Sequence, residues 1–317
     1  MSFAFVFAGQ GSQSVGMLGE LAAAQPVVRA TFEEASGVLG YDLWQLVQEG
    51  PEDALNATER TQPAMLAAGV ATWRAWRERG GALPTLVSGH SLGEFTALVC
   101  AEALGFAATV DLVRFRGRVM QEAVPAGSGA MAALLGLDDE AVLAVCREAA
   151  RGAVVEAVNF NSPGQVVIAG EAAAVARAIE AAKTRGAKRA VTLPVSVPSH
   201  SSLMRPAGER LRERLAGIEV GSPRIRYVSA VDARPHEEPG DIREMLVRQL
   251  SSPVRWTETL RALGTADVTA VIECSPGRVL TGLNRRIERR PDLSFFALED
   301  PASIDTALRA TRGQGHA

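Results

Sequence analysis

A serine flanked by glycines stands between a short apolar segment and a helical pattern, and this junction limits the folds open to the chain. The apolar segment is Leu86–Ser88, the turn is Gly89–Gly93 with the sequence GHSLG, and the helical pattern runs over Glu94–Ala101. The turn matches G-x-S-x-G, in which a sharp strand-to-helix bend exposes the serine Oγ. The helix N-terminus beyond it offers free N–H groups to a developing oxyanion. The sequence therefore predicts an α/β fold with Ser91 as nucleophile; the alternative is a chance match in a glycine-containing turn.

Short apolar runs, such as residues 225–229 and 269–273, alternate with longer helical patterns, such as residues 26–39 and 62–79, which is typical of α/β architecture. Residues 127–196 form a unit of their own, with strands predicted over 130–135, 154–158, 165–169 and 190–195 and two helices between them. The order β-α-β-β-α-β is the split βαβ pattern of a ferredoxin-like subdomain. We therefore expect residues 1–126 and 197–317 to form one α/β domain with a mostly parallel sheet, into which residues 127–196 are inserted.

Composition excludes several classes of protein. Hydrophobic residues make up 47% and charged residues 22% of the 317 residues, and the net charge of −3 does not favour a nucleic-acid-binding domain. The apolar run at residues 3–7 has no basic leader and is too short for a signal peptide or a membrane span. Cys100, Cys146 and Cys274 form no CxxC pair and no zinc-site spacing. We expect a cytoplasmic protein, because sparse cysteines fit a reducing compartment, with no membrane or nucleic-acid partner.

A serine hydroxyl is a weak nucleophile until a base takes its proton, and histidine is the usual base. The chain has four histidines. His90 adjoins the serine, where neighbouring side chains point apart; His236 lies in a charged, proline-containing loop; His316 lies in the C-terminal tail. His200 follows the last strand of the insertion, at a junction between subdomains where clefts form. By elimination we predict His200 as the base, with a structural role as the alternative.

No carboxylate presents itself as the third member of a triad. A Ser-His-Asp hydrolase has its acid between the nucleophile and the histidine in chain order. Asp138, Asp139 and Glu171 occupy this interval, but each is typical of the start of a helix. The pattern leaves open an orienting group other than a carboxylate.

One arginine falls on the apolar side of a helix predicted over residues 108–123. On a wheel at ~100° per residue, Arg114 and Arg118 gather with polar residues, whereas Arg116 lies among apolar ones. An inward guanidinium must be paired, because an unpaired buried charge is strongly destabilising. An internal carboxylate is one candidate partner. The other is an anionic substrate held by the bidentate fork, which would select an acyl group with a free carboxylate.

Six separated motifs together resemble those of malonyl-CoA:acyl-carrier-protein transacylases of fatty acid synthesis. The resemblance runs from Phe5 to about Glu299. The motifs are FAGQGSQ at 7–13, GHSLG at 89–93 followed by Glu94, Arg116-Gly117 with Met120-Gln121, NFNSPGQ at 159–165, Pro198-Ser199-His200, and Gln249-Leu250 with Pro253-Val254. One such match would be weak, but six in the same order are specific.

The resemblance implies a hydrolase-like α/β domain with a ferredoxin-like insertion, and it implies roles for the matching residues. Positions matching Ser91 and His200 form the catalytic dyad, and Arg116 binds the malonyl carboxylate. Backbone N–H groups of Gln10 and Leu92 form the oxyanion hole. A backbone carbonyl near Gln249 orients the histidine, which would account for the missing acid. The substrate-binding residues implied are Arg116, Gln249, Ser199 and Met120.

The implied reaction is a ping-pong transfer of malonyl from coenzyme A to the phosphopantetheine thiol of acyl carrier protein, without metal or redox cofactor. The expected partners are therefore the coenzyme A thioester and the carrier protein. We expect the enzyme itself to be a monomer. Two basic clusters are candidates for docking an acidic carrier, with a solvated charged face as the alternative. They are Lys183, Arg185, Lys188 and Arg189, and Arg285, Arg286, Arg289 and Arg290.

Three other functions stay open: a serine esterase or thioesterase, a stand-alone acyltransferase serving a polyketide synthase, and a non-catalytic binding module. Three positions also depart from the family pattern. Phe95 stands where relatives often have tyrosine, Ser229-Ala230 where some have asparagines, and Cys274-Ser275 in a stretch that is often Val-Gly. These departures concern details of the pocket, because none touches the predicted dyad or Arg116.

Overall fold

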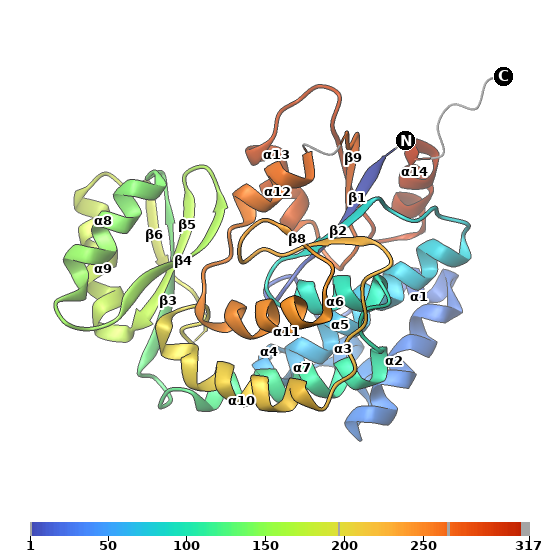
Figure 1. The fold of residues 1–317 in the computed structure, drawn as a ribbon, viewed down its shortest axis with the longest axis horizontal. Coiled ribbons are helices and arrows are strands. Elements are labelled where there is room, and N and C mark those ends of the chain that lie inside the picture. The colour runs from blue at the N-terminus through green and yellow to red at the C-terminus, as the bar shows by residue number, and fades with distance from the viewer. Residues whose placement is uncertain (1, 196, 265–266, 312–317) are drawn as a thin grey trace.

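A six-stranded sheet lies at the centre of the larger part of the computed structural model, which describes residues 2–195, 197–264 and 267–311 (Figure 1). Its strand order is β10-β9-β1-β2-β7-β8, and every neighbouring pair is parallel except β7 and β8. The strands are β1 Phe3–Phe7, β2 Leu86–Gly89, β7 Arg226–Val228, β8 Pro235–His236, β9 Ala270–Glu273 and β10 Ser294–Ala297. The residues of β1, β2 and β9 are all buried, as expected for parallel strands covered on both faces. The predicted fold class is confirmed.

Helices surround this sheet (Figure 1). They are α1 Gly19–Ala24, α2 Pro26–Leu39, α3 Leu43–Glu49, α4 Glu52–Asn56, α5 Thr58–Glu78, α6 Gly93–Cys100, α7 Phe106–Glu122, α10 Arg205–Ala216, α11 Pro239–Arg248, α12 Trp256–Gly264, α13 Val279–Ile287 and α14 Pro301–Thr311, with short 3-10 helices η1 Ser202–Met204 and η2 Gln249–Ser251. Helix α5 starts before the predicted residue 62, so that Pro63 lies inside it. Within the described residues, no helix is long and apolar enough to cross a membrane.

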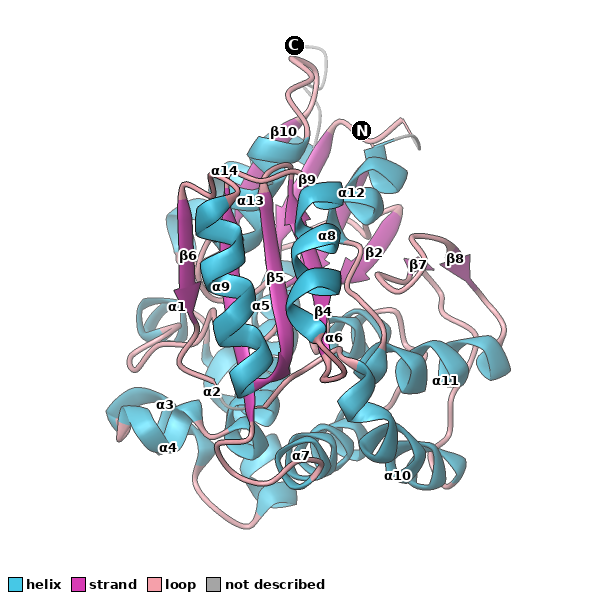
Figure 2. Cartoon of the chain, turned by 90° about the vertical axis from the view of Figure 1, so that its left-hand side faces the viewer, coloured by secondary structure: helices cyan, strands magenta, loops and turns pink. Residues whose placement is uncertain are grey.

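A second, antiparallel sheet lies to one side, covered on one face by two helices (Figure 2). Its elements follow the predicted order: β3 Gly129–Leu135, α8 Asp139–Ala150, β4 Val155–Ser162, β5 Gln165–Glu171, α9 Ala172–Thr184 and β6 Arg189–Thr192. The strand order β4-β5-β3-β6 places β5 between the two strands that α8 joins, as in a ferredoxin-like unit. Asp138 caps α8 by accepting a hydrogen bond from Ala141 N at 2.8 Å.

Two local expectations for this unit were wrong. Strand β4 continues through Asn161 and Ser162, so the turn to β5 is Pro163-Gly164 alone. Strand β6 ends at Thr192 rather than 195. The domain boundaries at residues 127 and 196 remain a prediction, since the sheet and its helices lie within them, from 129 to 192.

Backbone hydrogen bonds join the second sheet to the domain built around the six-stranded sheet. Phe160 N donates to Val254 O at 3.0 Å, and Val254 N donates to Val158 O at 2.8 Å. A parallel bridge between Asn159 and Val254 accompanies them. The segment that follows α11 and η2 is thereby fixed against β4, close to the loop that follows β2.

Candidate active site

Ser91 occupies a strained turn between β2 and α6. Its φ is 53°, in the left-handed region that non-glycine residues rarely adopt. The turn is closed by hydrogen bonds from Gly93 N to His90 O and from Glu94 N to Ser91 O, both 3.0 Å. The predicted strand–turn–helix setting is therefore present, and it leaves the Ser91 side chain only half-buried.

The flanking glycines are required by close backbone contacts. A Cβ on Gly89 would lie 1.9 Å from the carbonyl carbon of Gly93, and a Cβ on Gly93 would lie 2.0 Å from Phe7 O. Both are far inside van der Waals contact. The turn at residues 89–93, called the elbow below, therefore fits tightly against its own helix and against the end of β1.

The loop after β1 meets the elbow because β1 and β2 are parallel neighbours. A Cβ on Gly9 would lie 2.5 Å from His90 O and 3.7 Å from Leu92 N. Within the described residues, the backbone N–H groups of Gln10 and Leu92 have no hydrogen-bond acceptor. Two free donors beside Ser91 suit the oxyanion hole that the family resemblance implies.

His200 lies in the loop between β6 and η1, 4% exposed, with φ 65°. Its Nδ1 and the backbone carbonyl of Gln249 are 2.6 Å apart. With Nδ1–H donating to that carbonyl, Nε2 is left as the acceptor that a base needs. Burial first, and then the charge of Arg116, lower the pKa of His200 to about 3, so the imidazole is neutral at neutral pH.

Arg116 is buried in α7, 1% exposed, as the helical wheel predicts. Its Nη1 donates to Gln62 Oε1 at 2.9 Å and its Nη2 donates to Gln249 Oε1 at 2.7 Å. The centroid of the Phe95 ring lies 5.5 Å from the guanidinium carbon, so the expectation that this departure from the family pattern does not touch Arg116 was wrong. Burial lowers the pKa of Arg116 to about 10, which leaves it charged at neutral pH. Arg116 Nε is buried without a hydrogen-bond partner among the described residues.

Arg116 also holds the nucleophile: Nη2 donates to Ser91 Oγ at 3.2 Å. In the part of the chain that the structure describes, no hydrogen bond joins Ser91 Oγ directly to His200. Gln249 connects the two, because its side chain contacts Arg116 and its carbonyl contacts His200. The structure therefore gathers Ser91, Arg116, Gln249 and His200 into one network.

The internal carboxylate considered as a partner for Arg116 is present, but it contacts Gln249 and not Arg116 itself. Glu94, 1% exposed in α6, accepts from Gln249 Nε2 at 3.1 Å. Among the described residues, no ion pair joins it directly to Arg116. Burial raises the pKa of Glu94 to about 7, against the lowering effects of Tyr227, Ser229, Ala230 and Arg116.

Ser199 and Met120 are placed less centrally. Met120 is buried in α7, where its Sδ accepts from Gln62 Nε2 at 3.5 Å. It thus contacts the glutamine that holds Arg116. Ser199 is half-buried next to His200, and within the described residues its hydroxyl has no hydrogen bond to the other site residues.

Among the described residues, neither His90 nor His236 makes a side-chain hydrogen bond to the network. His90 Nε2 lies 2.9 Å from Asn161 Oδ1 in β4, which ties the elbow to the second sheet. His236 Nε2 contacts the Asp232 carboxylate at 3.1 Å, in edge strand β8. His316 lies outside the described residues.

Comparison with known proteins shows the family of this chain. The family model for the acyl transferase domain matches residues 4–292. The chain belongs to the acyl transferase family. It is 54% identical to the malonyl CoA-acyl carrier protein transacylase of Salmonella typhimurium over 96% of this chain and 98% of the relative, and 44% identical to that of Bacillus subtilis over 98% and 97%. A solved malonyl-transacylase in complex with a type II PKS acyl-carrier protein has TM-score 0.96 and 55% identity, covering 98% of this chain and 100% of that one.

Sequence reasoning missed several residues of this acyl transferase site. It assigned no role to Gln62, Glu94 or Tyr227, and it noted Phe95 only as a departure from the family. The available signal was weak: Gln62 is a polar residue inside the buried face of α5, and Glu94 is an acid in the first turn of α6, where acids are common anyway.

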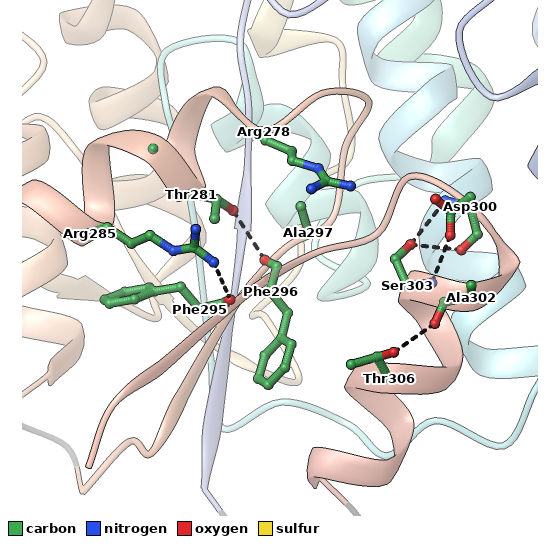
Figure 3. A pocket seen from close by; sticks show the side chains of 11 residues that line it. Arg278, Thr281, Arg285, Phe295, Phe296, Ala297, Asp300, Ala302, Ser303 and Thr306 are labelled. Carbon is green, nitrogen blue, oxygen red and sulfur yellow. Dashed lines mark hydrogen bonds between the residues drawn. The ribbon is translucent and has the colours of Figure 1, made fainter. Parts of the chain in front are cut away.

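Two surface hollows of the acyl transferase lie outside this network. One of about 450 Å³ is lined by α13, β10 and α14, including Arg278, Arg285 and Phe295 (Figure 3). One of about 520 Å³ lies beside Trp73 and Phe106. Neither is lined by Ser91 or His200. Within the described residues, no group of three or more His, Cys, Asp or Glu side chains could hold a metal ion.

Proposed function

We propose that this acyltransferase moves a malonyl group from malonyl-CoA to the phosphopantetheine thiol of acyl carrier protein in fatty acid synthesis, through an ester on Ser91. The observation that carries the proposal is a buried, charged Arg116 bonded to Ser91 Oγ, with its Nε unpartnered. A buried donor of this kind indicates a missing acceptor. A malonyl group has the thioester carbonyl that Ser91 attacks and, one methylene away, the carboxylate that a guanidinium binds.

In the first half-reaction, His200 Nε2 takes the Ser91 proton and Oγ attacks the thioester carbonyl. Gln10 N–H and Leu92 N–H hold the oxyanion of the tetrahedral intermediate. The C–S bond then breaks, and the coenzyme A sulfur leaves with the proton from His200. In the second half-reaction, His200 takes the proton of the phosphopantetheine thiol, the thiolate attacks the malonyl-serine, and the proton returns to Ser91 Oγ as the ester breaks.

The substrate carboxylate has a second effect in this proposal. Binding at Arg116 draws the guanidinium donors toward the carboxylate, which releases Ser91 Oγ for proton transfer to His200. It also offsets the positive charge that lowers the pKa of His200, so the imidazole becomes a better base. Malonyl-CoA thus activates the dyad, whereas an acyl group without a carboxylate leaves Ser91 bonded to Arg116.

The two basic clusters lie near the same end of the second sheet, two strands apart, which supports a carrier-protein docking surface. Arg286 of α13 donates to Gln165 Oε1 at 2.8 Å, and in the second sheet Gln165 is opposite Leu135, which is opposite Arg189. Lys183 and Arg185 are each paired with an acid, Glu180 and Glu148. The surface proposed for an acidic carrier is therefore centred on Lys188, Arg189 and Arg286, all exposed. A monomer in the cytoplasm without a cofactor is part of the same proposal.

Mass spectrometry of both proteins tests the function. Malonyl-CoA should add one malonyl group to the wild-type chain at Ser91 and none to Ser91→Ala. Holo carrier protein should then remove it and gain the same mass. A label that persists in Ser91→Ala would contradict the nucleophile. Rapid release of free malonate in the absence of carrier protein would instead favour an esterase or thioesterase.

A polyketide carrier is a second candidate acceptor. The solved malonyl-transacylase at 55% identity is in complex with a type II PKS carrier protein. Equal concentrations of a fatty-acid and a polyketide carrier in one reaction would rank them by the malonyl mass that each gains.

A further inference from the structure

The amide of Gln249 lies between the buried carboxyl group of Glu94 and the buried guanidinium of Arg116. Its Nε2 donates to Glu94 Oε1 at 3.1 Å, while its Oε1 accepts from Arg116 Nη2 at 2.7 Å. All three side chains are 1% exposed. A second, longer contact joins Gln249 Nε2 to Ser91 O at 3.5 Å.

Glu94 is itself fixed from the other side. Tyr227 Oη donates a short hydrogen bond to Glu94 Oε2, and Ala230 N donates to the same oxygen at 3.3 Å. With Oε2 occupied by these two donors, Oε1 is the oxygen that faces Gln249. Above its pKa of about 7, Glu94 is an ionised carboxylate that only accepts hydrogen bonds, so the side of the Gln249 amide that faces it must be the NH₂ group. The carbonyl side then necessarily faces Arg116.

We propose that Glu94 is a positioning residue for acyl selectivity: by fixing which side of the Gln249 amide meets Arg116, it holds the guanidinium where the substrate carboxylate binds. The inference rests on the proposed function, because it assumes that Arg116 receives the malonyl carboxylate. Glu94 acts through Gln249 and does not touch the acyl group.

Replacement by glutamine tests the donor and acceptor pattern without changing size. The backbone N–H of Ala230 cannot turn, so the oxygen of a glutamine at position 94 stays on that side and its NH₂ group faces Gln249. Two donors then oppose each other, and relief requires the Gln249 amide to turn its own NH₂ toward Arg116. The guanidinium loses an acceptor and moves away from its position, which weakens malonyl binding and leaves acetyl binding little changed.

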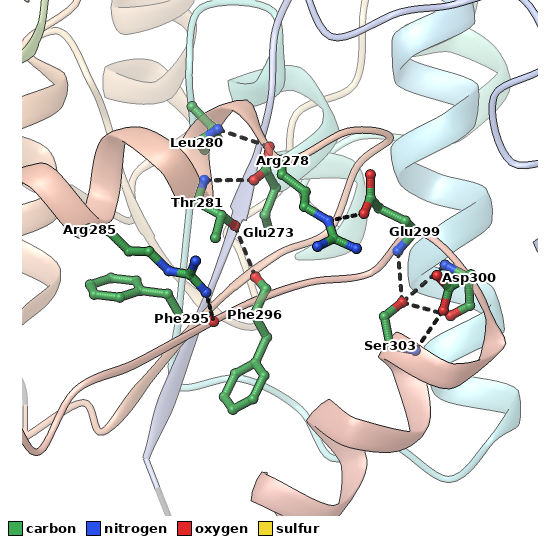
Figure 4. Close-up of polar contacts among 10 residues, drawn as sticks. All are labelled: Glu273, Arg278, Leu280, Thr281, Arg285, Phe295, Phe296, Glu299, Asp300 and Ser303. Carbon is green, nitrogen blue, oxygen red and sulfur yellow. Dashed lines mark hydrogen bonds and ion pairs between the residues drawn. The ribbon is translucent and has the colours of Figure 1, made fainter.

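Glu273 supplies a matched control. It is also 1% exposed, and burial also raises its pKa to about 7. Its carboxylate accepts from Leu280 N at 3.0 Å and Thr281 N at 2.7 Å at the start of α13 (Figure 4). Among the described residues, no hydrogen bond joins it to Ser91, Gln249 or His200. E273Q therefore removes a buried carboxylate of the same kind without altering the Gln249 amide.

The measurement is a competition for Ser91 between malonyl-CoA and acetyl-CoA at equal concentrations and at a pH well above the Glu94 pKa of about 7, read as the ratio of the two acyl-enzyme masses. E94Q should lower the malonyl-to-acetyl ratio about tenfold, the size expected for one hydrogen bond to a charged group, whereas E273Q should keep the wild-type ratio. A purely structural role would slow both acylations and leave the ratio unchanged, and this outcome would overturn the inference.

Two further results complete the test. The double variant E94Q/Q249L should have the ratio of Q249L alone, since Glu94 acts through that side chain; additive losses would contradict the inference. Should E94Q fail to fold, Q249L breaks the same link from the other end, and a wild-type ratio in Q249L would overturn it. If the wild-type chain itself gains no malonyl group, the proposed function fails together with the inference. If the wild type loads and E94Q keeps its ratio, the inference alone fails.

Discussion

Arg116 Nη2 lies 3.2 Å from Ser91 Oγ, so the cation expected to bind the substrate also holds the nucleophile. The bond joins the middle of α7 to the elbow, 25 residues apart in sequence. In this arrangement recognition of the acyl group and activation of the serine involve the same side chain. Selectivity should then appear in the rate of acylation and not only in binding.

Arg116→Ala should reduce malonyl loading of Ser91 by about 100-fold, because it removes a charge-assisted contact to the carboxylate. Acetyl loading should stay within a few-fold of wild type, since the substitution also releases Ser91 Oγ. Acyl-enzyme formation with each thioester measures both rates. Arg118→Ala is the matched control: Arg118 is exposed on the same helix, 3.9 Å from Glu122. Equal losses for malonyl and acetyl groups would contradict a carboxylate clamp.

His200 should remain neutral well below the usual pKa of histidine. Its pKa is lowered to about 3, first by burial and then by Arg116. NMR of chain labelled at the histidine ring, with His200→Ala to assign the signal, should show a neutral imidazole down to about pH 5. Arg116→Ala should move the midpoint upward, because the positive charge that lowers the pKa of His200 most after burial is removed. A midpoint near 6.5 in the wild type would show that the imidazole is not desolvated.

Gly93→Ala should destabilise the fold by about 3 kcal/mol or more, because the added Cβ would meet backbone that cannot move aside. The added Cβ would lie 2.0 Å from Phe7 O. Gly37→Ala is the control: Gly37 is exposed in α2 with no atom within 4 Å of the added Cβ, and it should gain about 1 kcal/mol from helix propensity. Urea unfolding measures both. A Gly93→Ala variant as stable as wild type would mean that the backbone around the elbow can move away from the added Cβ.

Glu273→Gln should flatten the dependence of stability on pH. Burial raises the folded-state pKa of Glu273 from 4.5 to about 7, so the folded state binds more protons than the unfolded state between these values. The stability contributed by the protonated form is complete below pH 4.5 and is lost as pH rises through about 7. Unfolding free energies at several pH values should therefore fall less steeply in the variant over this window. An unchanged slope would contradict the shifted pKa.

The sequence predicted the parts of the site that depend on local pattern. The elbow follows from one turn motif, and the inward side of Arg116 follows from helical periodicity. The partners of Arg116 could not be found this way, because Gln62 and Gln249 are 54 and 133 residues distant in sequence and come together only through packing. The role of Gln249 entered from a family resemblance rather than from its neighbours in the sequence.

The fold was predictable to a similar depth. Long periodic helices and buried strands were placed well, whereas the two-residue β8 and the edge strand β10 were not expected at all. Helix α5 was started too late because Pro63 is typical of the first turn of a helix, yet here it lies six residues in and costs one backbone hydrogen bond. Strand β4 was ended too early because Asn161 and Ser162 look like turn residues, although their backbone continues the strand.

The contact between His90 and Asn161 limits how this protein can be recombined with its relatives. A chimera that takes residues 127–196 from another member would transplant position 161 but leave position 90 behind. If the donor sequence has no amide side chain at position 161, the turn that carries Ser91 loses its side-chain hydrogen bond to the inserted subdomain. An engineered exchange of the insertion therefore has to transfer the residue at position 90 together with the residue at position 161.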